Sequence, residues 1–497
     1  MYAGLFTYQF TSLPACALVL AFLFACGSTD PRIPTALTLD ATALSFTSVG
    51  EQQQLSPTIT DQDGKTLSAD EASWSSSDPA VATVSQSGLV TARGSGNAQV
   101  TATAGSASAS AQISVVQTPA ELQKVSGDAQ TAPAGSTLPA PLVVEVNDAE
   151  GSPIQNATVN FTVSEGEGSI SNSTVVTGQN GTAATMFTTG TVAGAAQTVS
   201  ATVEGTSLSA SFSAIAASDP TSFNIGIRFL SDATPSQRKA FDDARLRWQT
   251  AISQDIEDGQ LDAEAGSCGA SSPAVHQMID DVLILVTLVD IDGEGGVLGG
   301  ASPCWIRDPG SLTIMGTMQF DVADLDMLEV EGILSNVVLH EMGHVLGFGT
   351  LWNLQGLLAD PSLPPDSGTD PHFTGPQAIA AFDNVGGTAY VAGAKVPVEN
   401  SGGPGTADGH WRESVLNNEL MTGFIGTGPS PLSVVTLGSL ADQGYGVNNS
   451  AADSYNLLLA LRSPGSTRPL VRLDKDILPL PIRKVNSRGH QTGELHR

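Results

Sequence analysis

The stretch "SNVVLHEMGHVLGFGTLW", from Ser335 to Trp352, decides how the second half of the chain is interpreted. Apolar residues recur here at helical spacing, which predicts a helix over residues 332–348. His340 and His344 are separated by one helical turn, so both side chains project from the same face. The buried stripe of this helix is expected to consist of Ile333, Leu334, Val337 and Val338.

The pattern H-E-x-x-H is typical of a zinc site. Two imidazoles one turn apart can bind one Zn²⁺, and Glu341 can activate a water molecule without being a ligand. Gly347 follows where the helix should end, since glycine readily adopts the left-handed conformation. The next position at which a third histidine is usual holds Thr350. Either the third ligand lies elsewhere, or the stretch is not such a site.

A later segment, "ADGHWRESVLNNELMTGF", contains His410 and, downstream of it, Met421. The combination of H-E-x-x-H-x-x-G-F, an insertion, H-W and E-L-M resembles the leishmanolysin family of metzincin zinc endopeptidases, peptidase family M8. The resemblance implies that His410 is the third zinc ligand and that Met421 lies in a turn beneath the metal. The matching residues are His340, Glu341, His344, Gly347, Phe348, His410, Trp411, Glu419, Leu420 and Met421.

The same resemblance implies an α+β peptidase domain over residues 222–461, which hydrolyses proteins or peptides by a zinc-activated water with Glu341 as general base. Tyr390 and Tyr445 are candidates for the oxyanion donor, without support from spacing. The chain has far fewer cysteines than the family, and no cysteine-bearing pro-segment is evident. One alternative is a surface adhesin whose peptidase-like domain is inactive, and another is a gluzincin with a downstream glutamate ligand. The presence of Glu341 argues against the first, and Met421 argues against the second.

The first half of the chain predicts two all-β modules. The segment "WSSSDPAVATVSQSGLVTA" resembles the bacterial Ig-like group 2 module, which implies a sandwich over residues 33–116 with Trp74 in or near its core. The segment "PLVVEVNDAEGSPIQNATVNF" alternates apolar and polar residues and resembles the group 1 module of invasin- and intimin-type proteins, which places a second sandwich at residues 118–216. Such modules either bind a host or cell-surface partner or serve as spacers. The predicted fold is therefore multidomain: two Ig-like sandwiches followed by an α+β metzincin-type domain.

Composition excludes one class of partner and indicates a compartment. The chain has 497 residues and a formal net charge of −30, which argues against nucleic-acid binding, because that requires a basic surface. The apolar run "ACALVLAFLFACGS" is too short to span a bilayer and fits an export signal over residues 1–26. Its end resembles a bacterial lipoprotein cleavage box with Cys26 as the lipidated residue. We expect an exported protein, either anchored in the envelope through that lipid alone or secreted.

Three smaller features complete the predictions. Cys268 and Cys304 form an even pair in an exported chain, which favours one disulfide over two buried thiols. The acidic turn "VDIDGEGG" begins like a calcium loop but lacks the closing glutamate, so a solvated turn is favoured over a Ca²⁺ site; its acidic residues are Asp290, Asp292 and Glu294. Residues 463–497 show no periodicity and are expected to form a disordered tail.

Overall fold

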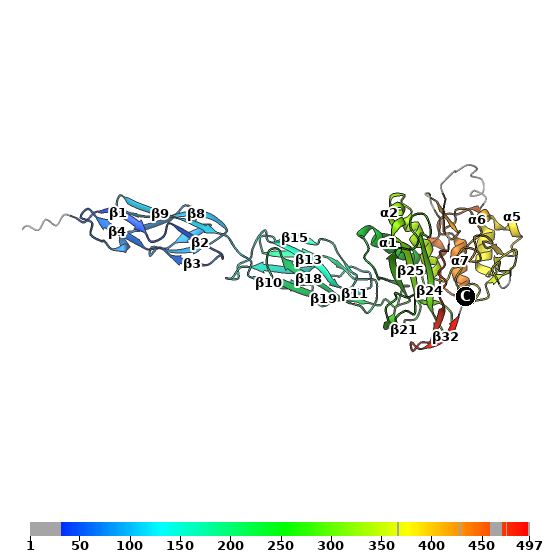
Figure 1. Cartoon of the computed structure of the whole chain (residues 1–497). Helices are drawn as coiled ribbons and strands as arrows, with labels where there is room; N and C mark the ends of the chain where they lie inside the picture. Colours follow the sequence, from blue (N-terminus) through cyan, green and yellow to red (C-terminus); the bar gives the residue numbers. More distant parts are fainter. Residues whose placement is uncertain are drawn as a thin grey trace, which may run out of the picture. The chain divides into compact units, whose positions relative to one another are not determined.

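The computed structural model describes residues 31–364, 367–426, 428, 430–457, 470–473 and 475–495. The chain divides into two compact units, Met1–Thr118 and Pro119–Arg497. The second unit contains a β module followed by a domain of mixed helices and strands (Figure 1). Within the described part of the chain, no helix is both long and apolar enough to cross a membrane. The predicted export signal and Cys26 lie outside the described residues.

The first unit is a β-sandwich. A four-stranded sheet of order β2-β9-β8-β5 faces a three-stranded sheet of order β3-β7-β6, and β1 pairs with β4. Phe46, Val100 and Ile113 from the larger sheet share one buried cluster with Val90 from the smaller sheet, and Trp74 packs against it as predicted. The strands are β1 Pro34–Leu39, β2 Ala43–Phe46, β3 Gln52–Gln54, β4 Pro57–Asp61, β5 Ser73–Ser76, β6 Ala82–Val84, β7 Leu89–Ala92, β8 Gly96–Ala104 and β9 Ala107–Val115.

The second module is also a sandwich. Sheets of order β10-β12-β16 and β11-β19-β18-β13-β15 enclose one core, and β14 pairs with β17. The predicted alternation is confirmed, because Val144 and Val146, and likewise Val159 and Phe161, are buried, while Glu145 and Asn160, one within each pair, are half-buried. The strands are β10 Glu121–Ser126, β11 Gln130–Pro133, β12 Leu142–Asn147, β13 Thr158–Glu165, β14 Ser169–Ile170, β15 Thr174–Val176, β16 Thr182–Thr185, β17 Phe187–Thr188, β18 Ala196–Val203 and β19 Ser209–Ala217.

The C-terminal domain is built on a six-stranded sheet of order β20-β23-β25-β24-β31-β32. Strands β20, β23 and β25 are parallel, β24 runs antiparallel to β25, and β31 runs parallel to β24. The strands of the domain are β20 Ile225–Phe229, β21 Gly259–Ala263, β22 Val275–Ile279, β23 Val282–Val289, β24 Gly299–Arg307, β25 Thr313–Asp321, β26 Leu358–Ala359, β27 His372–Phe373, β28 Val396–Pro397, β29 Phe424–Gly426, β30 Leu470–Arg472, β31 Ile482–Val485 and β32 Gln491–Leu495.

Both faces of this sheet are covered, which explains the continuous apolar run of β23. Ile284 faces the helices and lies in the main core, whereas Leu283 and Leu285 lie in a second cluster on the other face. Helix α3 packs against β24, β25 and α1. The helices are α1 Pro235–Ala251, α2 Val322–Val330, α3 Leu334–Val345, α4 Pro376–Phe382, α5 Thr388–Val391, α6 Glu413–Leu416 and α7 Val434–Gln443.

Helix α1 begins with a capping box. Thr234 is the N-cap, its hydroxyl accepts from the Gln237 amide, and the Gln237 side chain accepts from the Thr234 amide in return. Pro235 occupies the first turn, where its missing N–H costs nothing. Trp248 on the buried face donates from Nε1 to the Leu339 carbonyl of α3, 2.9 Å away, and so ties the two helices together.

The expectation of a disordered tail over residues 463–497 is wrong for the residues described there. Strand β30 pairs with β29, and strands β31 and β32 extend the central sheet beyond β24 (Figure 1). Ile482 and Val485 are buried on this extension. Strands of so few residues show little periodicity in their sequence. They are ordered because they pair with strands far away in the sequence.

Candidate metal centre

Three histidines meet in the C-terminal domain, and the backbone fixes the orientation of each ring. Nδ1 of His340 lies 2.7 Å from the Leu420 carbonyl, and Nδ1 of His344 lies 2.9 Å from the Phe348 carbonyl. Nδ1 of His410 lies 2.9 Å from the carbonyl of a residue four positions earlier. A carbonyl can only accept, so each Nδ1 carries a proton and donates, and in a neutral ring this leaves Nε2 with a free lone pair.

The three Nε2 atoms point at one another. The separations are 2.9 Å between His340 and His344, 3.1 Å between His340 and His410, and 3.0 Å between His344 and His410. Ligands placed tetrahedrally about 2.0–2.1 Å from one ion lie roughly 3.3 Å apart. Three converging imidazole nitrogens near that spacing are a donor set that fits Zn²⁺.

The helix and loops that carry these residues can approach closely because of glycine. Gly349 has φ +69°, and a Cβ there would lie 2.0 Å from the Gly409 carbonyl oxygen. The loop preceding His410 therefore lies directly against the chain that leaves α3. Gly347, with φ +113°, follows the end of that helix as predicted.

Glu341 is fully buried beside the histidines. Neither of its carboxylate oxygens has a hydrogen-bond partner among the described residues. Burial raises the pKa of Glu341 well above its usual range, and the charge of Asp476 raises it further. Burial also lowers the pKa of His344 to about 4 and lowers that of His340, which favours the neutral form that binds metal, whereas the pKa of His410 is raised by Asp476 despite its burial.

Met421 lies beneath the helix that carries two of the histidines. A Cβ on Gly343 would lie 2.8 Å from its Cε and 2.9 Å from its Sδ. The turn is held by the buried carboxylate of Glu419, whose Oε2 accepts from the Met421 amide at 2.6 Å. Oε1 of the same carboxylate accepts from the hydroxyls of Ser433 at 2.7 Å and Thr436 at 2.6 Å, at the start of α7.

A fourth group joins the cluster, and sequence reasoning missed it. Oδ2 of Asp476 lies 2.9 Å from Nε2 of His410, 3.3 Å from that of His340 and 3.7 Å from that of His344. Asp476 is buried and lies in the segment predicted to be a disordered tail. No motif surrounds it, and the only sequence signal is the apolar content of the following "ILPLPI".

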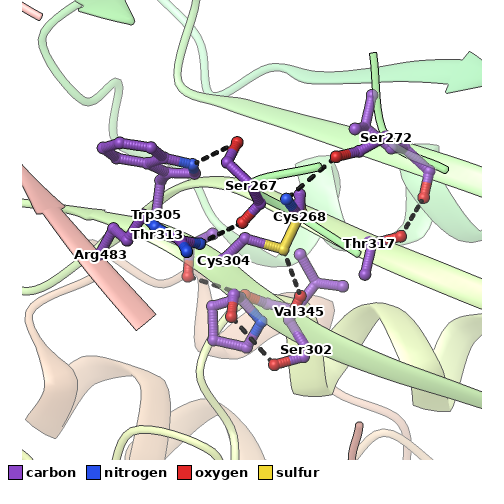
Figure 2. The surroundings of a disulfide bond; sticks show 12 residues. Ser267, Cys268, Ser272, Ser302, Cys304, Trp305, Thr313, Thr317, Val345 and Arg483 are labelled. Carbon is purple, nitrogen blue, oxygen red and sulfur yellow. Dashed lines mark hydrogen bonds between the residues drawn. A yellow bond between two sulfur atoms is a disulfide. The ribbon is translucent and has the colours of Figure 1, made fainter. Parts of the chain in front are cut away.

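The two predicted disulfide partners lie together. The structure joins Cys268 to Cys304 of β24 across a sequence separation of 36 (Figure 2). Both residues are buried in the cluster on the face of the sheet opposite the histidines. The disulfide therefore ties the loop after β21 to the strand that borders the candidate metal centre.

Other candidates do not gather into a site. Asp290, Asp292 and Glu294 lie in a loop whose amides bind the buried carboxylate of Asp321, and they are absent from the acidic clusters found in the described part of the chain. The Tyr445 hydroxyl, a candidate oxyanion donor, instead donates to the Leu346 carbonyl at 2.8 Å. The other tyrosine named for that role, Tyr390, is 40% exposed.

Comparison with known families agrees with this division of the chain. Residues 268–457 match the family model of leishmanolysin, peptidase family M8, so the C-terminal domain carries a peptidase-family match. Residues 35–115 match the bacterial Ig-like domain of group 2, and residues 122–215 match that of group 1. The predicted family resemblances, and two Ig-like sandwiches followed by an α+β domain, are confirmed.

Solved structures similar to this chain include bacterial adhesins. The Yersinia pseudotuberculosis adhesin InvE is 18% identical, with a TM-score of 0.23, over 37% of this chain and 60% of that one. The Escherichia coli adhesin FdeC is 21% identical, with a TM-score of 0.22, over 36% of this chain and 63% of that one. The chain thus spans less than two thirds of each. No curated protein matches the chain.

Proposed function

We propose that the C-terminal domain is a zinc endopeptidase, with His340, His344 and His410 as the metal ligands and Glu341 as the general base. The observation that carries this proposal is the convergence of three Nε2 atoms, 2.9–3.1 Å apart. Beside them lies the buried carboxylate of Glu341, which has no hydrogen-bond partner among the described residues. The match to a metallopeptidase family supports the same assignment.

The residues divide the chemistry between them. A Zn²⁺ ion bound there supplies Lewis acidity, which polarises a peptide carbonyl and makes water nucleophilic at neutral pH. Glu341 accepts the proton of the attacking water and then delivers it to the nitrogen of the departing amine. Burial favours the first of these steps, because a raised pKa makes the Glu341 carboxylate a stronger base toward the proton of water. Met421 packs against Gly343 and holds the two helical histidines in place from below.

The N-terminal modules favour a location outside the cell. Ig-like domains of these two groups support adhesion, so we propose an exported peptidase carried on modules that bind or space it from a surface. Its substrates are proteins or peptides, and its attachment to a membrane would be through lipidated Cys26 alone. The second candidate function is a surface adhesin whose peptidase-like domain is catalytically inactive.

Hydrolysis of casein by the zinc-loaded full chain separates these functions. The Asp476 carboxylate faces the three histidines and could block substrate. The assay therefore uses Asp476→Ala protein beside wild type, each with and without Glu341→Gln. The proposal predicts that Glu341→Gln keeps the metal and abolishes cleavage wherever cleavage is seen. If zinc-loaded protein cleaves nothing in either background, the domain is not an endopeptidase and the adhesin function is favoured.

A further inference from the structure

The segment around Asp476 pairs with the edge of β24. The Asp476 carbonyl accepts from the Ala301 amide at 2.6 Å, and the Leu478 amide donates to the Ala301 carbonyl at 3.0 Å. The pairing is parallel, and β31 continues it along Trp305–Arg307. The chain's own C-terminal segment therefore occupies an edge of the sheet to which an extended peptide could otherwise add.

The side chain of the same residue occupies the centre. Asp476 is only 1% exposed, and its Oδ2 lies within 2.9–3.7 Å of all three Nε2 atoms. A catalytic zinc site keeps one position open for water or substrate, whereas a site with four protein ligands is closed. Asp476 thus pairs with the strand edge through its backbone and faces all three Nε2 atoms with its carboxylate.

Three glycines shape the surface that receives this segment. A Cβ on Gly300 would lie 2.9 Å from Cδ2 of Leu478, and one on Gly405 would lie 2.6 Å from Cα of Lys475. A Cβ on Gly409 would lie 2.3 Å from Cδ1 of Ile477. The contact at Gly405 is with backbone and leaves no room for a Cβ, whereas the side-chain ends of Leu478 and Ile477 would have to shift to admit one at the other two glycines.

A second set of contacts holds the segment beyond the centre. Arg483 of β31 donates to the Ser267 carbonyl, beside the disulfide (Figure 2). Its guanidinium also lies 5.9 Å from the centre of the Trp305 ring. The segment is therefore built into the domain rather than resting on it.

We infer that Asp476 is a fourth metal ligand and that residues 475–485 hold the peptidase in a latent form by excluding water and substrate. This inference rests on the proposed zinc site. It assigns the control of latency to the C-terminal segment. Activity then requires displacement of the segment from β24.

The test uses the full chain loaded with Co²⁺, with inorganic azide as the probe of an open coordination position. Azide binding is followed by the visible absorption of the metal, and zinc content is measured on parallel samples. The variants are Asp476→Ala, Asp476→Asn and Ile477→Asn, the last of which weakens seating of the segment without changing a ligand. Lys475→Ala is the matched control, since its exposed side chain belongs to the same segment.

The inference predicts that wild type and Lys475→Ala bind azide at least tenfold more weakly than Asp476→Ala and Asp476→Asn, with Ile477→Asn between them. All variants should retain zinc, and casein hydrolysis should rise at least tenfold in the two Asp476 variants. Azide binding by wild type as tight as by Asp476→Ala would overturn the inference. Loss of zinc from both Asp476 variants would also overturn it, because the aspartate would then be a permanent structural ligand. Increased azide binding without casein hydrolysis would support the closed site while refuting the endopeptidase.

Discussion

Replacing Glu419 by glutamine should destabilise the C-terminal domain, although the two side chains have nearly the same shape. The carboxylate is fully buried and accepts from two backbone amides and two hydroxyls. In Glu419→Gln, either the NH₂ group faces the Met421 amide, or a flip turns it toward the Ser433 amide; each orientation puts two donors together. A lost charge-assisted bond costs about 1.5–3 kcal/mol, and an unsatisfied buried donor costs a further ~1–3 kcal/mol. We expect a net loss of about 3 kcal/mol.

Urea unfolding followed by tryptophan fluorescence measures this loss, because Trp248, Trp305, Trp352 and Trp411 all lie in the C-terminal domain. The control is Glu331→Gln, an exposed glutamate at the end of α2, which should change the free energy of unfolding by less than about 0.5 kcal/mol. If Glu419→Gln is as stable as this control, the buried carboxylate does not hold the methionine turn and the reasoning is refuted.

Three further predictions concern the same domain. Cys304→Ser should lower its free energy of unfolding by about 3–4 kcal/mol in the chain-entropy model; urea midpoints equal to wild type would contradict a stabilising disulfide. Gly349→Ala should lower zinc affinity at least tenfold, because its Cβ would strike the Gly409 carbonyl at 2.0 Å; equilibrium dialysis showing unchanged affinity would refute the close approach. Burial raises the pKa of Asp280 and of Asp281 to about 7, so the stability associated with their protonated forms is complete below about pH 4 and is lost as pH rises through 7. Asp280→Asn should therefore raise the thermal midpoint at pH 8 and not at pH 4, and an equal effect at both pH values would count against the raised pKa.

Local sequence patterns predict much of the fold. The buried stripe of α3 is encoded within a few residues, so the sequence predicts it directly. The same is true of alternation in β12 and β13, where one face is buried. Helix α3 proved shorter than the predicted span of residues 332–348, because the residues after Val345 turn toward Gly347.

The candidate metal centre was predictable only in part. His340 and His344 share one helix, so their spacing alone places them together, and the family resemblance supplied His410 across the insertion. Asp476 could not be found in this way, since its position depends on pairing with Ala301, which lies far away in the sequence. Pairing of that kind follows from tertiary contacts, and a lone aspartate beside prolines carries no local pattern that would reveal it.

The measurement that tests the central claim most directly is the zinc content of the full chain after dialysis, comparing wild type with His410→Ala. His276→Ala is the control, because that histidine lies on β22 with its side chain 52% exposed. We predict about one zinc per chain in wild type and in His276→Ala. The same account predicts that His410→Ala loses its zinc. Retention of a full equivalent of zinc by folded His410→Ala would show that the three converging histidines are not the metal site.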